Sequence, residues 1–247
     1  MLEATWVSLV IGIAAFVQSC AGFGFALISV PVLALFLDLK VAVPLTVFYS
    51  VLLCVPLSFI MRQDIQKKAV LFLTLGTTPG MFIGVEFLKR AKPEYVLVFM
   101  GFILFFYCAY ELLKRKTTFI NFNSFATMFI GLISGILGAS VGESGPPIVV
   151  YASAQNWTSD QIKSTILCFF SIQMAGILMV YIFDGMYHKQ IMELGINTFP
   201  AFVVGGLLGL LTYRSIKSNQ VTYHRIIYSM LMLNGVYIFF SNIVKVI

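Results

Sequence analysis

The sequence predicts an all-α polytopic membrane protein made of two inverted repeats, each a broken helical hairpin followed by three transmembrane helices. Composition is the first reason. Of 247 residues, 60% are hydrophobic and 11% are charged, whereas soluble domains carry roughly 25% charged residues. So much apolar surface exceeds what one globular core can bury, which leaves the lipid bilayer as the solvent. A series of long apolar runs and an internal repeat are the other two reasons.

The apolar runs give the expected helices in chain order. Most of them reach the roughly 20 residues that a helix needs to cross a hydrocarbon core. They cover residues 4–37, 41–61, 69–88, 95–113, 122–137, 146–154, 166–183, 191–213 and 226–244. The basic residues stand in short clusters at the ends of these runs, an arrangement that indicates membrane topology and argues against a nucleic-acid partner.

The internal repeat divides the chain into a first transmembrane repeat (residues 1–113), a polar linker (114–121) and a second transmembrane repeat (122–247). A shift of 120 residues, or of 121 near the end of each repeat, aligns glycine, proline and aspartate positions of the two halves. The aligned pairs are Gly22 with Gly142, Val30 with Val150, Asp64 with Asp184, Pro79 with Pro200 and Gly84 with Gly205.

The opening of each repeat is interrupted by glycine. Residues 4–37 are too long for one crossing and break at Gly22-Phe23-Gly24, while residues 122–154 break at Gly142-Glu143-Ser144-Gly145-Pro146-Pro147. The two prolines suit the first turn of a resumed helix, where a missing N–H costs nothing. We therefore expect two helical hairpins with broken tips. A hairpin returns the chain to the side it left, so each repeat makes three net crossings and the repeats are inverted.

The distribution of positive charge supports the hairpins. With hairpins, ten of the sixteen basic residues gather at one membrane face and six at the other. With one long bent helix in each opening, the same residues divide eight and eight. Because cytoplasmic loops carry an excess of Lys and Arg, we expect the face with residues 62–68 and 114–116 to be cytoplasmic. Both termini would then lie outside the cytoplasm.

The two tips form the candidate site for a small anion. The helices that resume after Gly24 and Gly145 would aim free N–H groups and positive dipole ends into the interior, and such ends attract anions. No Lys or Arg lies in either hairpin, so dipoles and neutral donors would hold the anion. The candidate substrate-binding residues are Gln18, Ser19, Gly22, Gly24, Ser140, Gly142, Ser144, Gly145 and Gln173. An alternative is that these small residues only let helices pack closely.

Glu143 is the candidate coupling residue. Most other acidic residues have a basic neighbour a few positions away, as Glu86 has Lys89 and Arg90, whereas Glu143 lies far from any basic residue and inside a predicted tip. Ionisable groups within a membrane are costly and usually functional. Glu143 could take up a proton when the anion binds. The alternative is that its carboxylate only shapes the tip by accepting hydrogen bonds at a helix N-terminus.

The cysteines predict neither a metal site nor a cofactor. Cys20, Cys54, Cys108 and Cys168 all lie within apolar runs, and none has the spacing of a CxxC or Cys/His metal motif. Small buried apolar side chains are the expected role of all four. Cys20 alone stands close to a predicted tip.

These features resemble the sulfite exporter TauE/SafE family over nearly the whole chain. The resemblance rests on Gly22-Phe23-Gly24 with Val30-Pro31, on the glycine-rich run 131–138, on Gly142-Glu143-Ser144-Gly145-Pro146, and on the pairs Pro79/Gly84 and Pro200/Gly205. It implies a transporter in a prokaryotic cytoplasmic membrane that exports sulfite, sulfoacetate or a related organosulfonate, driven by a proton or sodium gradient.

The resemblance reaches only part of the candidate site. It covers the matching tip positions, namely Gly22, Gly24, Gly142, Ser144 and Gly145, while Gln18, Gln173 and Glu143 rest on the physical argument above. Phe23 and Phe25 in the first tip and Glu143-Ser144 in the second depart from the commoner glycine-rich tip of the family.

Two other functions are open to the same residues. Gly142-Glu143-Ser144-Gly145 fits the short GxSG pattern of intramembrane serine proteases, with Ser144 as nucleophile, but the two histidines, His188 and His224, stand in polar segment ends and make poor bases for it. A cation channel requires rings of acidic side chains or carbonyl filters, and one intramembrane acid gives it little support. We therefore expect a transporter and no enzymatic activity.

Overall fold

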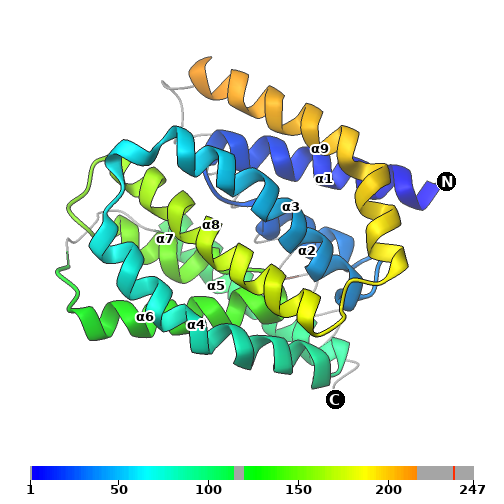
Figure 1. Cartoon of the computed structure of the whole chain (residues 1–247), viewed down its shortest axis with the longest axis horizontal. Coiled ribbons are helices and arrows are strands. Elements are labelled where there is room, and N and C mark those ends of the chain that lie inside the picture. Colours follow the sequence, from blue (N-terminus) through cyan, green and yellow to red (C-terminus); the bar gives the residue numbers. More distant parts are fainter. Residues whose placement is uncertain (1, 114–119, 216–235, 237–247) are drawn as a thin grey trace.

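The described residues of the computed structural model, 2–113, 120–215 and 236, form only helices as regular elements (Figure 1). In chain order these are α1 Leu2–Ala21, α2 Phe25–Leu33, α3 Leu39–Ile60, the short 3-10 helix η1 Arg62–Asp64, α4 Lys67–Arg90, α5 Pro93–Leu113, α6 Ser124–Val141, α7 Gly145–Ser153, α8 Ser159–Phe183 and α9 Lys189–Ser215. The all-α prediction is confirmed. The predicted helix at residues 226–244 lies outside the described residues.

Five helices are long and apolar enough to cross a membrane, which confirms the membrane prediction. They are Leu39–Ile60, Lys67–Arg90, Ser124–Val141, Asp160–Phe183 and Lys189–Thr212. Large apolar side chains cover their outer faces, including Phe59, Leu75, Phe82, Phe183, Ile196 and Leu207, all at least half exposed. An outer surface of this kind would be unfavourable in water and is suited to lipid.

Polar caps fix the starts of several helices. The Asp38 side chain accepts the Lys40 N–H at 2.8 Å and starts α3. Thr158 and Gln161 form a reciprocal capping box at the start of α8, in which each side chain accepts the other residue's backbone N–H. As a result α8 begins at Ser159, ahead of the apolar run that predicted it from residue 166.

The second hairpin, α6 with α7, reverses the chain. The Ile120 N–H, just before α6, donates to the Ala154 carbonyl at the end of α7 (2.8 Å). At the other end of α7, the Ser144 carbonyl accepts the Ser134 hydroxyl of α6 (2.9 Å). A nine-residue helix is about 14 Å long, roughly half of a hydrocarbon core. The N-terminus of α7 therefore lies part-way across the bundle.

The first hairpin, α1 with α2, has the same plan. The nine-residue α2 starts where the Gln18 Oε1 of α1 accepts the Phe25 N–H at 2.8 Å. Both tips turn on glycines with positive φ, +84° at Gly22, +109° at Gly24 and +77° at Gly142, a region that other residues rarely adopt.

Two tight helix pairs flank the tips, α4 with α6 and α1 with α9, and α3 packs against α8 between them (Figure 1). Glycines make these contacts possible. A Cβ added to Gly76, Gly80 or Gly84 of α4 would collide with the backbone of α6, and one on Gly205 or Gly209 of α9 would collide with the backbone of α1. Close packing by small residues is therefore the role of these glycines.

Hydrogen bonds and an ion pair between turns and neighbouring helices show which turns share an end of the bundle. At one end, the Gln66 N–H after η1 donates to Thr165 Oγ1 near the start of α8 (3.0 Å). At the other, Lys89 of α4 pairs with Asp184 after α8 (3.4 Å), and the Tyr187 hydroxyl donates to the Pro44 carbonyl near the start of α3 (2.9 Å). The relation of two inverted repeats stays a prediction, and the linker predicted at 114–121 lies mostly outside the described residues.

Candidate functional site

The two tips meet at one small cavity. Its walls come from both hairpins and from the two helices that cross between them, α3 and α8. The lining residues are Gln18, Gly24, Ala26, Leu27, Ser50, Cys54, Glu143, Ser144, Gly145, Phe170 and Met174. The cavity measures about 30 Å³, enough for one or two water molecules.

The cavity lies near the middle of the bundle. Ser50 and Cys54 stand near the midpoint of the 22-residue α3, and Phe170 and Met174 stand near the midpoint of the 25-residue α8. Ser50 and Phe170 are 120 residues apart, as are Cys54 and Met174. The residues that α3 and α8 contribute to the cavity are thus aligned positions of the predicted repeat.

Helix N-termini supply backbone donors to the cavity. The first N–H groups of a helix have no acceptor within that helix, and Ala26 and Leu27, in the first turn of α2, both line the cavity. Gly145 supplies one such N–H from α7, but Pro146 and Pro147 have none to give. The first tip therefore offers more backbone donors to an anion than the second.

Gln18 links the first tip to α3. Its Oε1 accepts the Phe25 N–H at 2.8 Å, and its Nε2 donates to the Cys54 sulfur at 2.9 Å. The side chain is buried and lines the cavity. A bound anion would accept the Nε2 donor in place of the weak sulfur acceptor.

Glu143 places a carboxyl group in the cavity wall without a partner. Its side chain is 1% exposed, and neither carboxylate oxygen has a hydrogen-bond partner among the described residues. A helix-capping role is therefore not what the structure shows. Burying an ionised carboxylate that has neither a hydrogen bond nor a counterion is costly, so this position calls for a proton or a cation.

Gln173 supports the second tip but does not line the cavity. Its Nε2 donates to Thr77 Oγ1 of α4 (2.9 Å) and to Ser134 Oγ of α6 (3.2 Å). Ser134 in turn donates to the Ser144 carbonyl (2.9 Å). Gln173 thus acts on the tip through Ser134, and its Oε1 has no partner among the described residues.

An aromatic cluster holds the first tip. Phe25, at the start of α2, packs against Tyr49 of α3 and Phe202 of α9, with ring centroids 6.2 and 6.3 Å away. The Tyr49 hydroxyl donates to the Gly195 carbonyl (2.5 Å) and shares a hydrogen bond with Thr198 (2.7 Å). These contacts tie α2, α3 and α9 together beside the cavity.

Besides Gln173, four predicted site residues lie away from the cavity. Ser19 faces Gly206 and Gly209 of α9. The Ser140 hydroxyl donates to the Ile136 carbonyl of its own helix (2.7 Å). The glycines Gly22 and Gly142 form the turns of the tips and pack against side chains of the opposite repeat. The cavity therefore brings together Gln18, Gly24, Glu143, Ser144 and Gly145 of the predicted set.

Sequence reasoning missed three residues at the tips. Ser50 and Cys54 of α3 line the cavity, although α3 carries no break to mark them. Lys163 of α8 lies along Gly22, because a Cβ added to that glycine would fall 2.9 Å from Lys163 Cγ. The hairpins themselves contain no basic residue, but the structure brings one to the first tip from another helix.

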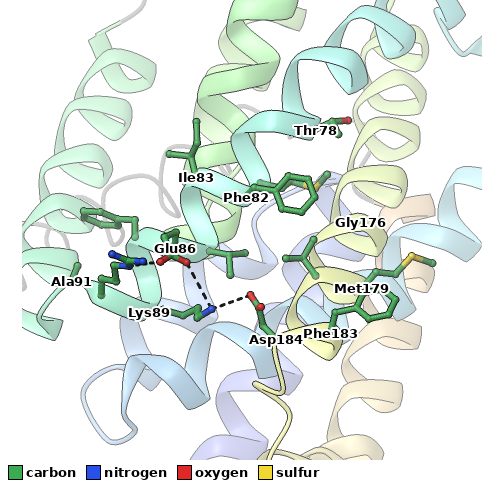
Figure 2. Close-up of a pocket in the computed structure, with 15 residues that line it drawn as sticks. Thr78, Phe82, Ile83, Glu86, Lys89, Ala91, Gly176, Met179, Phe183 and Asp184 are labelled. Atoms are coloured by element: carbon green, nitrogen blue, oxygen red, sulfur yellow. Dashed lines mark hydrogen bonds and ion pairs between the residues drawn. The ribbon is translucent and has the colours of Figure 1, made fainter.

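A much larger groove, of about 1150 Å³, lies between the ends of α4 and α8. Its walls include Phe82, Met179 and Phe183, and at its polar end Lys89 pairs with Glu86 and Asp184 (Figure 2). The exposed apolar walls belong to the lipid-facing surface. The ion pairs of Glu86 with Lys89 and Arg90 confirm the predicted pairing. No residue of either tip lines the groove.

Within the part of the chain that the structure describes, Ser144 has no histidine beside it. Ser144 lies against the middle of α8, beside Phe170 and Met174, whereas His188 is exposed beyond the end of that helix. From Met174 to the helix end at Phe183 is about 14 Å. His224 lies outside the described residues. Among those residues, no three His, Cys, Asp or Glu side chains gather as a metal site.

Comparison with known families matches most of the chain to a family model. The family model described as sulfite exporter TauE/SafE matches residues 7–238 of the chain. Neither the curated proteins nor the solved structures contain a match.

Proposed function

The chain belongs to the sulfite exporter TauE/SafE family, a family of membrane transporters, and we propose that it carries a sulfur-containing anion through the cavity between its two tips. Sulfite, sulfoacetate or a related organosulfonate is the proposed substrate, and the cytoplasmic membrane of a prokaryotic cell is the proposed location. The proposed direction is export.

The observation that carries this proposal is the meeting of two helix N-termini at one central cavity. Irregular backbone within a membrane is tolerated only where it is buried in protein or lines a cavity. Here the first turns of α2 and α7 both line the cavity, together with the side chains of Gln18, Ser50 and Ser144. Such a site offers hydrogen bonds to sulfonate or sulfite oxygens without a fixed positive charge, which favours release as well as binding.

The cavity as it stands is closed to the substrate. Sulfite, with one sulfur and three oxygen atoms, needs more room than the one or two waters that the cavity can hold. The tips must therefore separate to admit it. We assign this separation to movement of one hairpin against the other, as in transporters whose site lies between two repeats.

Glu143 is the proposed coupling group. Its buried carboxyl has no partner among the described residues and shares the cavity with the proposed anion. A proton or a sodium ion that neutralises it would offset both the burial of a charge and its repulsion from the anion. Movement of that cation along its gradient, together with the anion or in exchange for it, would then be coupled to movement of the anion, and export along an inward cation gradient would require the exchange.

Transport by the purified protein tests this function. The protein is reconstituted in liposomes and given radiolabelled sulfite, sulfoacetate, taurine or acetate, with an imposed proton or sodium gradient. We expect saturable uptake of a sulfur-containing anion, in preference to acetate, that responds to one of the two gradients. Uptake no faster than in empty liposomes for every anion would contradict the proposal, and so would flux of cations alone.

A further inference from the structure

Lys163 lies lengthwise over the first tip. A Cβ added to Gly22 would fall 2.9 Å from Lys163 Cγ, 3.4 Å from Cδ and 3.1 Å from Cε. The lysine stem thus follows the bare backbone of the turn. The side chain is half-buried, an unusual position for a basic residue in an apolar bundle.

Packing alone does not require a lysine there. The 120-residue shift pairs Gly22 with Gly142 and Val43 with Lys163. In the structure a Cβ added to Gly142 would fall 3.5 Å from Val43 Cγ1. Val30 Cγ2 would be nearer still, at 2.8 Å, so Val30 and Val43 together cover Gly142, and Val43 is the aligned counterpart of Lys163. Valines thus cover the second tip, whereas Lys163 brings to the first tip a positive charge that has the carboxylate of Asp160, three residues earlier in α8, as an acidic neighbour.

The first tip lies between the cavity and the Arg62–Asp64 end of the molecule. Gly22 donates its N–H to the Gln18 carbonyl (2.7 Å), and Gln18 lines the cavity. Two residues beyond Lys163, Thr165 accepts a hydrogen bond from Gln66 in the turn that follows Arg62–Asp64. Lys163 therefore stands between that end and the cavity, whereas the aligned position at the second tip is uncharged.

We propose that Lys163 is the cation that draws the anion from the Arg62–Asp64 end of the molecule, past Gly22, into the central cavity. The inference rests on the proposed transport function and adds a one-sided entrance to it. A positive charge beside a low-dielectric path lowers the energy of an anion on that path. Because Val43 replaces it at the second tip, the attraction acts on one side only.

Transport measured from each side separately tests this inference. Inside-out and right-side-out membrane vesicles, prepared from cells that express the chain, are given radiolabelled sulfite. Lys163→Met keeps the apolar stem and removes the charge. We expect it to raise the KM about tenfold or more for sulfite offered at the Arg62–Asp64 end and to leave the KM from the other side unchanged. Lys163→Arg should restore the wild-type KM.

A matched control separates this role from a general surface effect. Lys68→Met removes the same charge at the same end from an exposed position away from the tip, and it should leave both KM values unchanged. Rates are scaled to the folded protein in each preparation, and Lys163→Gln serves as a second neutral variant. An unchanged KM in both neutral variants, or an equal rise in Lys68→Met, overturns the inference. Vesicles of the wild type that move no sulfite overturn the proposed function instead.

Discussion

At the scale of single residues, the cavity combines neutral donors with one acid. Both polar atoms of the Gln18 side chain already form hydrogen bonds, Oε1 with the Phe25 N–H and Nε2 with the Cys54 sulfur. On anion binding, Nε2 would donate to an anion oxygen in place of the weak sulfur acceptor. Glu143 has no such partner among the described residues. The charge state of the Glu143 carboxyl therefore has the largest effect on whether the cavity can also hold an anion.

Glu143→Gln should separate binding from coupling. Glutamine keeps the shape of the side chain but cannot release or take up a proton. We expect the variant to bind sulfite in detergent with an affinity within about threefold of the wild type, because no donor is removed, and to transport it without response to a pH gradient. Glu86→Gln, at an ion-paired surface position, is the control. A Glu143→Gln variant with its pH response intact leaves that residue a structural part only.

Sequence reasoning found the cavity residues that stand at breaks in apolar runs. Gly24 and Glu143 are visible because glycine and acid interrupt a membrane helix. Ser50 was not predictable, because α3 is unbroken and the position of Ser50 depends on where α3 crosses the tips. The sequence predicts Ser19 at the site beside Gln18, but successive helical residues point about 100° apart, and in the structure Ser19 faces α9.

At the scale of helices, glycine decides which pairs approach closely. Gly205 and Gly206 are neighbours on α9 with different surroundings. A Cβ on Gly205 would collide with the backbone of Gly12 on α1, whereas one on Gly206 would lie 3.5 Å from the flexible Leu53 side chain. The first position is therefore part of the helix contact and the second is not.

Gly205→Ala should destabilise the protein while Gly206→Ala should not. The collision forces α1 and α9 apart, and overpacking of this kind costs about 1–3 kcal/mol or more. An added methyl group at Gly206 meets ordinary contact distances and favours the helix slightly. Unfolding of both variants in detergent micelles, followed by circular dichroism, measures the difference. Equal stability of the two would show that close approach of α1 and α9 is not needed.

The apolar runs predicted where the helices lie, but they did not predict where every helix begins. The run that predicted α8 starts at residue 166, whereas the helix starts at Ser159, because a polar first turn with a capping box leaves no apolar signal. The start of α7 was predictable, because two prolines after Gly145 suit the first turn of a helix, and the structure begins α7 at Gly145. Capping chemistry, not hydrophobicity, sets the start of α8.

At the scale of the whole molecule, each hairpin returns to the end of the bundle that it left, and the two hairpins start from opposite ends, because α1 runs parallel to α9 and α6 runs parallel to α4. α1 packs in parallel with α9, since Gly12 meets Gly205 and Phe16 meets Gly209, so α1 begins where α9 and α3 begin. The end of α7 returns to Ile120. This plan leaves a nine-residue half-helix from each hairpin facing the central cavity.

Cysteine labelling from the two sides of the membrane tests the hairpins. In a background without native cysteines, Thr5→Cys and Lys40→Cys should react with an impermeant reagent from one side. Asn121→Cys and Asn156→Cys should react from the other side. A long bent helix in place of α1 and α2 would put the first two positions on opposite sides, and that outcome would rule out the hairpin.

The Kd for sulfite of the wild type and of three variants tests the central claim, which is that an anion binds between the two tips. Gln18→Ala and Ser144→Ala each remove a donor from the cavity, and loss of one donor in a dry site costs about 1–3 kcal/mol, or roughly 5- to 150-fold in Kd. Ser140→Ala removes a hydroxyl that bonds to its own helix and should bind like the wild type. We predict weaker binding in the first two variants only. Unchanged Kd values in both Gln18→Ala and Ser144→Ala would contradict the claim and place the anion elsewhere.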